Sequence, residues 1–284
     1  MDIEIPPGLH WHQHTTLPDG SLLHPELRPE GGMGRMMGNR IDTDCPLLYL
    51  AEQLESGSVR SRHHHPRGQL AWAASGVLKV ITETGSWIVP SSHAVWIACH
   101  VEHEILVVSP ASIRYLFIDP SVADRLPDQC QVMAVTPLLR EMIIRLTSRD
   151  LLKPDCKDRR LIDVVLDELG SLDTSPMHLP AGQDRRLQAV MALISRDPSD
   201  MRNLPELASE VGASPRTLER LFQNETGMSF RQWRSRLKLL EAVQRLGDGE
   251  SSAAIALSLG YSSSSAFIAA FRKVFGQPPQ SFAG

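Results

Sequence analysis

Two stretches near the carboxyl end decide the fold: LPELASEVGASPRTLERLFQNETG, residues 204–227, and AAIALSLGYSSSSAFIAAFRKVFG, residues 253–276. Each begins with a short amphipathic segment, turns at a glycine (Gly212 or Gly260), and continues from a serine into a second segment with helical spacing. Glycine suits such a turn because it adopts the left-handed backbone conformation without strain. The pattern predicts two helix-turn-helix units in tandem, the second with one extra residue in its turn.

The stretch between the two units predicts a single linking helix. Ser229 and Gly247 bound it, and apolar residues recur between them at steps of three and four. These residues are Phe230, Trp233, Leu237, Leu240, Val243 and Leu246. A helix of about five turns follows. We expect it to hold the two units at a fixed separation.

The segment IALSLGYSSSSAFIAAFRKVFGQPPQSF, residues 255–282, resembles the signature of the AraC/XylS family of transcriptional regulators. It has that family's GYSS turn, paired phenylalanines, Phe-Arg-Lys step and Gly-x-x-Pro exit, and the resemblance extends over residues 185–284. It implies a DNA-binding domain for a double-stranded operator, with RNA polymerase as a partner if the protein is an activator. The alternative is a helical bundle without DNA contact.

Charge agrees with a local DNA-binding patch. Residues 184–284 hold 13 Lys and Arg against 10 Asp and Glu, whereas the whole chain has a net charge of −4. This balance argues against a protein that coats nucleic acid indiscriminately.

The first recognition helix predicts three DNA contacts. Because Leu218, Leu221 and Phe222 turn inward, the outward early positions are Arg216, Thr217 and Arg220. An arginine near the start of such a helix can pair with guanine O6 and N7. The alternative is that these arginines are only solvated surface residues.

The second recognition helix has a different chemistry. A polar or basic residue often lies near Ala269 in the family, so the alanine here disfavours strong base reading by this helix. We expect it to hold phosphate and DNA shape instead, because hydroxyls and a helix start suit phosphate oxygens. The predicted contacts are Ser263, Ser264, Ser265, Arg272 and Lys273.

Residues 46–120 predict an antiparallel sandwich or barrel, because short apolar runs alternate with turns. The runs are PLLYLAEQL (46–54), QLAWAA (69–74), GVLKVITE (76–83), SWIVP (86–90), HAVWIA (93–98), HEILVV (103–108) and SIRYLFI (112–118).

A histidine pattern lies within these strands. Gly57-x5-His63-x-His65-x3-Gln69-x6-Gly76 resembles the first cupin motif, with glutamine in place of the usual glutamate. His103 stands where the second motif has its histidine, although the usual Pro-x-Gly before it is missing. The region therefore resembles the cupin-type sensor domain found ahead of many AraC-family DNA-binding domains.

Three interpretations of these residues stay open. His63, His65 and His103 can form a site for a divalent metal, they can line a metal-free effector pocket together with Gln69, or they can be structural. A rival function is a cupin dioxygenase or isomerase with a DNA-binding tail. The substituted Gln69 argues against catalysis, so we expect a regulator that senses a small-molecule effector and is not an enzyme.

The remaining segments complete the expected architecture. Residues 136–152 and 159–169 predict amphipathic helices, which in the resembled architecture form a homodimer interface. The alternative is that they only cap the barrel. Residues 170–182 are rich in Gly, Ser and Pro and predict a flexible connection. The expected division is a partly ordered leader at 1–45, a cupin-like domain at 46–120, a helical dimerisation segment at 121–170, a linker at 171–184, and the DNA-binding domain at 185–284.

Composition excludes several classes of protein. There is no apolar run near twenty residues and no signal-peptide pattern, so we expect a cytoplasmic protein without a membrane partner. The four cysteines lack C-x-x-C spacing, which argues against a disulfide framework and a zinc finger. The predicted fold class is α+β: an antiparallel cupin-like barrel with a helical segment, followed by an all-α domain.

Overall fold

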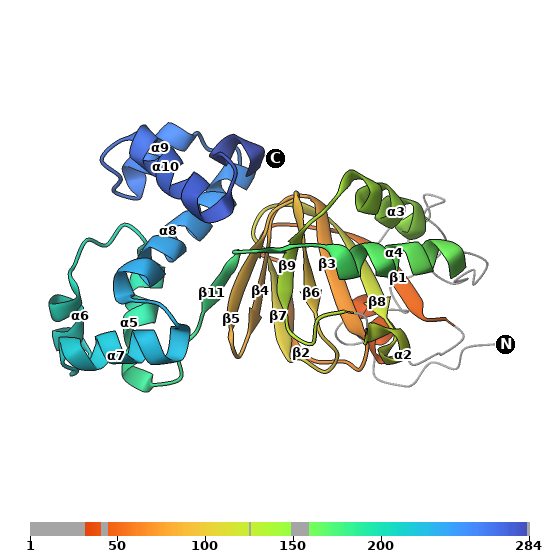
Figure 1. Ribbon diagram of the computed structural model, residues 1–284, viewed down its shortest axis with the longest axis horizontal. Coiled ribbons are helices and arrows are strands. Elements are labelled where there is room, and N and C mark those ends of the chain that lie inside the picture. Colours follow the sequence, from red (N-terminus) through yellow and green to blue (C-terminus); the bar gives the residue numbers. More distant parts are fainter. Residues whose placement is uncertain (1–31, 41–44, 125, 149–158, 283–284) are drawn as a thin grey trace.

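The computed structural model describes residues 32–40, 45–124, 126–148 and 159–282. Within these ranges the strands form two antiparallel sheets (Figure 1). The six-stranded sheet has the order β1-β8-β3-β6-β9-β10, and the five-stranded sheet has the order β11-β5-β4-β7-β2. The strands are β1 (Leu47–Leu54), β2 (Val59–His63), β3 (Gly68–Ser75), β4 (Leu78–Thr82), β5 (Gly85–Val89), β6 (His93–Ile97), β7 (His103–Val107), β8 (Ala111–Ile118), β9 (Gln131–Ala134), β10 (Thr174–Ser175) and β11 (His178–Pro180).

Helices surround the sheets and form the carboxyl-terminal domain. They are α1 (Gly32–Asn39), α2 (Pro120–Ala123), α3 (Pro137–Thr147), α4 (Arg159–Ser171), α5 (Arg185–Arg196), α6 (Leu204–Glu210), α7 (Pro215–Thr226), α8 (Phe230–Gly247), α9 (Ser252–Ser258), α10 (Ser264–Phe275) and the 3-10 helix η3 (Pro279–Phe282). The predicted fold class is confirmed: a β-rich amino-terminal domain precedes an all-α domain (Figure 1).

The barrel-like domain has two apolar layers. Alternate residues of β8 illustrate them, because Ile113, Tyr115 and Phe117 face the space between the sheets while Leu116 and Ile118 face outward. The outward set packs under α3 and α4, which cover that sheet face (Figure 1). A strand buried on both faces is the result.

The two helix-turn-helix units are confirmed as α6–α7 and α9–α10, joined by α8. Gly212 and Gly260 both have positive φ, 65° and 74°, at the expected turns. Ser214 and Ser263 cap the second helix of each unit, and the second turn is one residue longer, as predicted. The units lie at opposite ends of α8 (Figure 1).

Two parts of the expected division need correction. The segment 121–170 is not wholly helical, because β9 within it pairs with β6. The connection expected to be flexible contains β10 and β11, which pair with β9 and β5. The sequence pattern did not predict these strands because they are short and polar. Their backbone groups pair with the otherwise unpaired edge strands of both sheets. Of the leader, the structure describes residues 32–40 and Cys45, of which 32–39 form α1.

Candidate functional site

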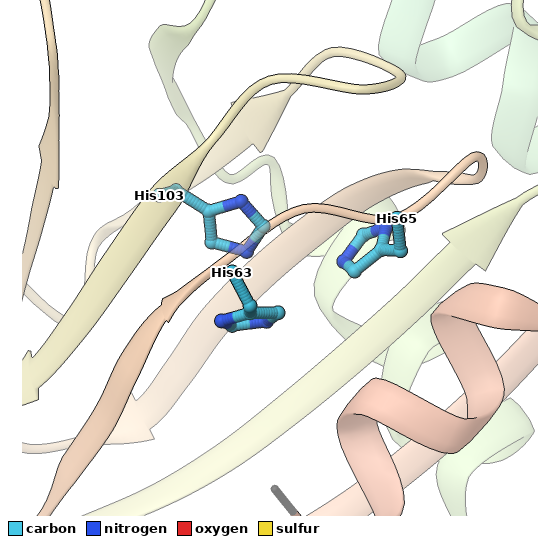
Figure 2. Close-up of side chains that lie close together, drawn as sticks. All are labelled: His63, His65 and His103. Carbon is cyan, nitrogen blue, oxygen red and sulfur yellow. The ribbon is translucent and has the colours of Figure 1, made fainter.

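The three predicted histidines come together inside the barrel-like domain (Figure 2). β2 and β7 place His63 opposite His103 in the antiparallel register, with ring centroids 4.3 Å apart. His65 lies in the loop after β2, which ends at His63, and its ring is 5.2 Å from that of His103. The candidate ligand nitrogens all lie within 4.8 Å of one another.

Backbone carbonyls set the tautomer of each ring. The Nδ1 atoms of His63, His65 and His103 bond to carbonyl oxygens of residues 61, 67 and 101 at 2.7, 2.7 and 2.8 Å. A carbonyl only accepts, so each Nδ1 donates its proton. In His103 this leaves a lone pair on Nε2, whereas Nε2 of His65 lies 2.8 Å from the amide oxygen of Gln69. The Nε2 of His103 is buried without a hydrogen-bond partner in the described structure, although buried polar atoms normally have one.

Burial favours the neutral imidazole in His65 and His103. It lowers the pKa of His65, and it lowers the pKa of His103 to about 3, with a smaller contribution from the neighbouring imidazoles. Gln69, on β3 and only 3% exposed, bonds to the Nε2 of His65 at 2.8 Å. Its neutral amide leaves the cluster without the negative charge that a glutamate would add.

The donor set fits a late first-row divalent ion. Neutral imidazoles suit zinc, copper and nickel, whereas magnesium and calcium prefer oxygen ligands. Carbonyl bonds to the opposite ring nitrogens are the support that metal-binding histidines usually have. His63, His65 and His103 would hold the ion, which would supply a Lewis-acidic position for a donor atom of an effector.

Helix α1 covers this cluster. A Cβ atom added to Gly38 would lie 2.4 Å from Cγ of His65, so the helix backbone touches the imidazole ring directly. Gly38 also accepts a hydrogen bond from the backbone N–H of Arg67 at 3.3 Å. The close contact between α1 and the ring of His65 therefore requires glycine at position 38. The backbone hydrogen bond from Arg67 helps to hold α1 in this place.

Arg67 is a structural centre that the sequence reasoning missed. Its guanidinium is fully buried, pairs with Asp119 at 3.1 Å, and donates to the carbonyls of Arg40, Cys45 and Pro46. These bonds hold Arg40, which follows α1, and Cys45 and Pro46, which precede β1. No sequence pattern predicted its burial, because an arginine next to histidines is normally expected to be exposed.

Helix α7 presents Arg216 and Arg220 to solvent, as predicted. Leu218 and Phe222 on its opposite face are fully buried. Thr217 is half-buried, and its hydroxyl lies 2.8 Å from that of the cap residue Ser214. Thr217 is thus already engaged in the cap, which sets it apart from the two arginines.

Helix α10 separates its predicted contacts into two groups. Ser263 caps the helix by accepting the backbone N–H of Ala266 at 3.1 Å, Ser264 is half-buried, and Ser265 is exposed. Arg272 and Lys273 are exposed in the last turn. The serines and the cations therefore lie about 10–15 Å apart along the helix.

Both domains match known families. Residues 46–169 match the AraC-like ligand binding domain, and residues 207–284 match a helix-turn-helix domain. The HTH-type transcriptional regulator NimR of Escherichia coli strain K12 is 38% identical over 218 residues, which cover 76% of this chain and 80% of NimR. The chain belongs to the AraC family of transcriptional regulators.

Other similar proteins cover different shares of the chain. The HTH-type transcriptional regulator RipA of Corynebacterium glutamicum is 33% identical over 109 residues, 38% of this chain and 32% of RipA. The crystal structure of unsaturated fatty acid bound ToxT from Vibrio cholerae covers 86% of this chain and 96% of its own, with 13% identity and a TM-score of 0.36. Among the described residues of this AraC-family protein, no helix is both long and apolar enough to cross a membrane.

Proposed function

We propose that this AraC-family regulator binds a double-stranded DNA operator through α7 and α10, and that a small-molecule effector in the barrel-like domain controls that binding. The observation that carries the proposal is the outward polar face of each recognition helix, at the two ends of one rigid helix (Figure 1). Such a pair is suited to successive major grooves.

Base reading is assigned to Arg216 and Arg220. Both are exposed, and within the described part of the chain neither side chain forms an ion pair or a hydrogen bond. Four residues along a helix separate them by about 6 Å, close to two base-pair steps. Thr217, Ser263, Ser264, Ser265, Arg272 and Lys273 are assigned to phosphate and sugar contacts.

Selection of binding sites from a random duplex library tests this assignment. Arg216→Ala and Arg220→Ala should each relax the preference at one base pair, by about 1–3 kcal/mol. Lys273→Ala should weaken binding evenly across sequences and reduce the salt dependence by about one phosphate contact. Identical selectivity profiles for all three variants would refute the division of roles.

The effector site is assigned to His63, His65, Gln69 and His103. The supporting observation is the unpaired Nε2 of His103, which a ligand donor or a metal ion would satisfy. A divalent transition metal on the three histidines is the second candidate, supported by their convergent nitrogens. Metal analysis of protein purified without chelator decides between them, because less than about a tenth of an equivalent excludes a resident ion.

A homodimer through α3 and α4 is the third part of the proposal. Leu138 on α3 is 55% exposed and Val164 on α4 is 45% exposed, although both helices bury their other apolar residues against the sheet. Exposed apolar side chains on adjacent helices favour self-association. Sedimentation that finds only monomer at micromolar concentration would refute it.

We infer that the protein acts without catalysis and in the cytoplasm, where its operator would be found. The neutral Gln69 and the regulators among its relatives support the first inference. If the protein activates transcription, RNA polymerase is its further partner.

A further inference from the structure

The connection between the domains is built into the wall of the barrel. β10 is the outer strand of the six-stranded sheet, and β11, only two residues later, is the outer strand of the five-stranded sheet. The register pairs Ser175 with Val132 and His178 with Trp87. This one segment therefore bridges the gap between the two sheet edges. We call the segment, residues 174–180, the seam.

Side chains of helix α8 donate hydrogen bonds to backbone carbonyl groups of the seam. The guanidinium of Arg236 donates to the carbonyls of Pro176 at 3.1 Å and His178 at 3.4 Å. One turn earlier on the same face, the indole N–H of Trp233 donates to the carbonyl of Pro180 at 2.9 Å. Two side chains of the linking helix thus hold three carbonyls of the seam.

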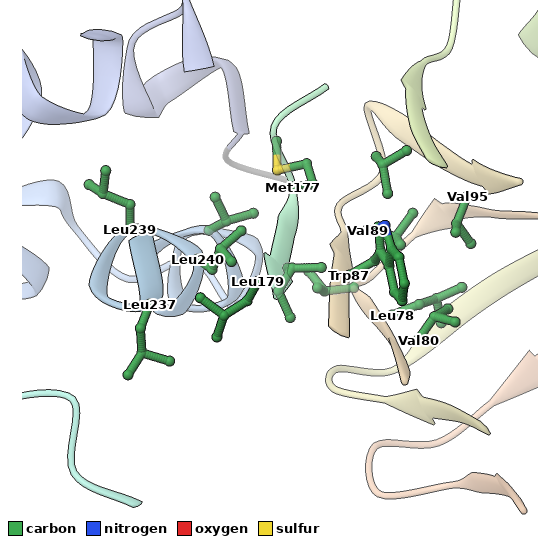
Figure 3. Packing of buried hydrophobic residues seen from close by; sticks show 14 of the residues in the cluster. Leu78, Val80, Trp87, Val89, Val95, Met177, Leu179, Leu237, Leu239 and Leu240 are labelled. Carbon is green, nitrogen blue, oxygen red and sulfur yellow. The ribbon is translucent and has the colours of Figure 1, made fainter. Parts of the chain in front are cut away.

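Apolar packing is continuous across the same contact. Leu179 lies between Leu240 of α8 and Trp87 of β5 (Figure 3). Met177, 1% exposed, belongs to the same cluster, which extends to the residues between the sheets. Contacts between domains of one chain are usually smaller and more polar, so this cluster indicates a fixed junction.

Two further contacts occur beyond the seam. A Cβ atom added to Gly247, at the carboxyl end of α8, would lie 2.3 Å from Cγ2 of Val77. The ring of His93 on β6 stacks on Phe282 of η3, with centroids 5.7 Å apart and planes at 12°. Contacts spread along α8 and at η3 oppose rotation of the helical domain about the seam.

We propose that the seam and α8 form a rigid coupling that fixes the orientation of both helix-turn-helix units relative to the barrel and to α3 and α4. A change in the spacing of the two sheets would then reach α8 through Arg236 and Trp233 without passing through a flexible linker. The consequence for DNA rests on the operator binding and dimer proposed above: a dimer with fixed domain orientation accepts one half-site spacing.

Calorimetry of the full chain tests the coupling without DNA or effector. The wild type should unfold in one transition, because the domains share a core. Trp233→Phe combined with Arg236→Ala should separate the unfolding of the two domains, and Gly247→Ala should do so by forcing Val77 away. Arg231→Ala, an exposed position on the same helix, is the matched control and should leave one transition. Two transitions in the wild type, or one in every variant, would overturn the coupling.

Half-site spacing tests the consequence. With an operator selected by the wild type, inserting about 5 base pairs between half-sites turns one of them to the opposite face of the duplex. We expect the wild type to lose about 100-fold or more in affinity, and the Trp233→Phe/Arg236→Ala variant to lose less than about 10-fold. Equal losses would refute the link to spacing. Failure to select any operator would refute the proposed function, while calorimetry would still decide the coupling.

Discussion

Two glycines on one helix test whether α1 covers the histidine cluster. Gly34 and Gly38 both lie within α1 without positive φ, so alanine fits the backbone at either position. In a helix, alanine is favoured over glycine by about 0.5–1 kcal/mol. Gly34→Ala and Gly38→Ala should therefore gain the same propensity term and differ only in what the new methyl group meets.

The structure predicts opposite outcomes. At Gly34 a Cβ would lie 3.7 Å from Cζ of Phe117, an ordinary contact. At Gly38 it would lie 2.4 Å from Cγ of His65, about 1 Å inside a normal carbon contact. The ring cannot move freely, because both of its nitrogens are hydrogen-bonded. Overpacking of this kind costs about 1–3 kcal/mol.

Urea unfolding of the full chain measures the difference. Gly34→Ala should raise the free energy of unfolding by up to about 1 kcal/mol, whereas Gly38→Ala should leave it about 1–3 kcal/mol below that of Gly34→Ala. Gly38→Ala should also weaken any metal binding by moving His65. Equal stability of the two variants would show that α1 does not lie against the imidazole.

Three further outcomes are expected. Burial lowers the pKa of His93 to about 4 from an ordinary 6.5, so the unfolded state binds a proton at higher pH than the folded state. The free energy of unfolding should therefore fall by up to about 3 kcal/mol as the pH drops from 6.5 to 4. His93→Gln should flatten this pH dependence in denaturation curves. Ser263→Ala should cost about 1 kcal/mol of stability through loss of the cap, whereas Ser265→Ala should lower DNA affinity alone; equal melting losses would contradict this. Leu138→Glu with Val164→Glu should yield a folded monomer in sedimentation, and a persistent dimer would place the interface elsewhere.

Local sequence patterns predicted the helices of the carboxyl-terminal domain well. Ser214 and Pro215 placed the start of α7, and the spacing of apolar residues placed α8 within one residue of its observed ends. These signals are local: a cap bonds to a backbone group three residues away, and a helical face repeats within one turn. The histidine cluster was also predicted, because the motif named its residues and the strand order brought His63 opposite His103.

The missed elements depend on distant partners. β10 and β11 are too short to show alternation. α1 contains glycines that disfavour a helix in isolation, and its contacts with β1 and β8 stabilise it. Arg67 is buried because four carbonyls from three segments, together with Asp119, converge on it, which no local pattern encodes.

By itself the sequence determined the two helix-turn-helix units, their arginine-bearing face and the identity of the three histidines, because caps, turns and periodic apolar positions act over a few residues. Only the tertiary structure decided that the connection is part of both sheets and that α8 is fastened to it. Those features arise because unpaired backbone groups at the sheet edges, and apolar side chains of both domains, contact residues that are remote in the chain. Such contacts exist only once the chain is folded.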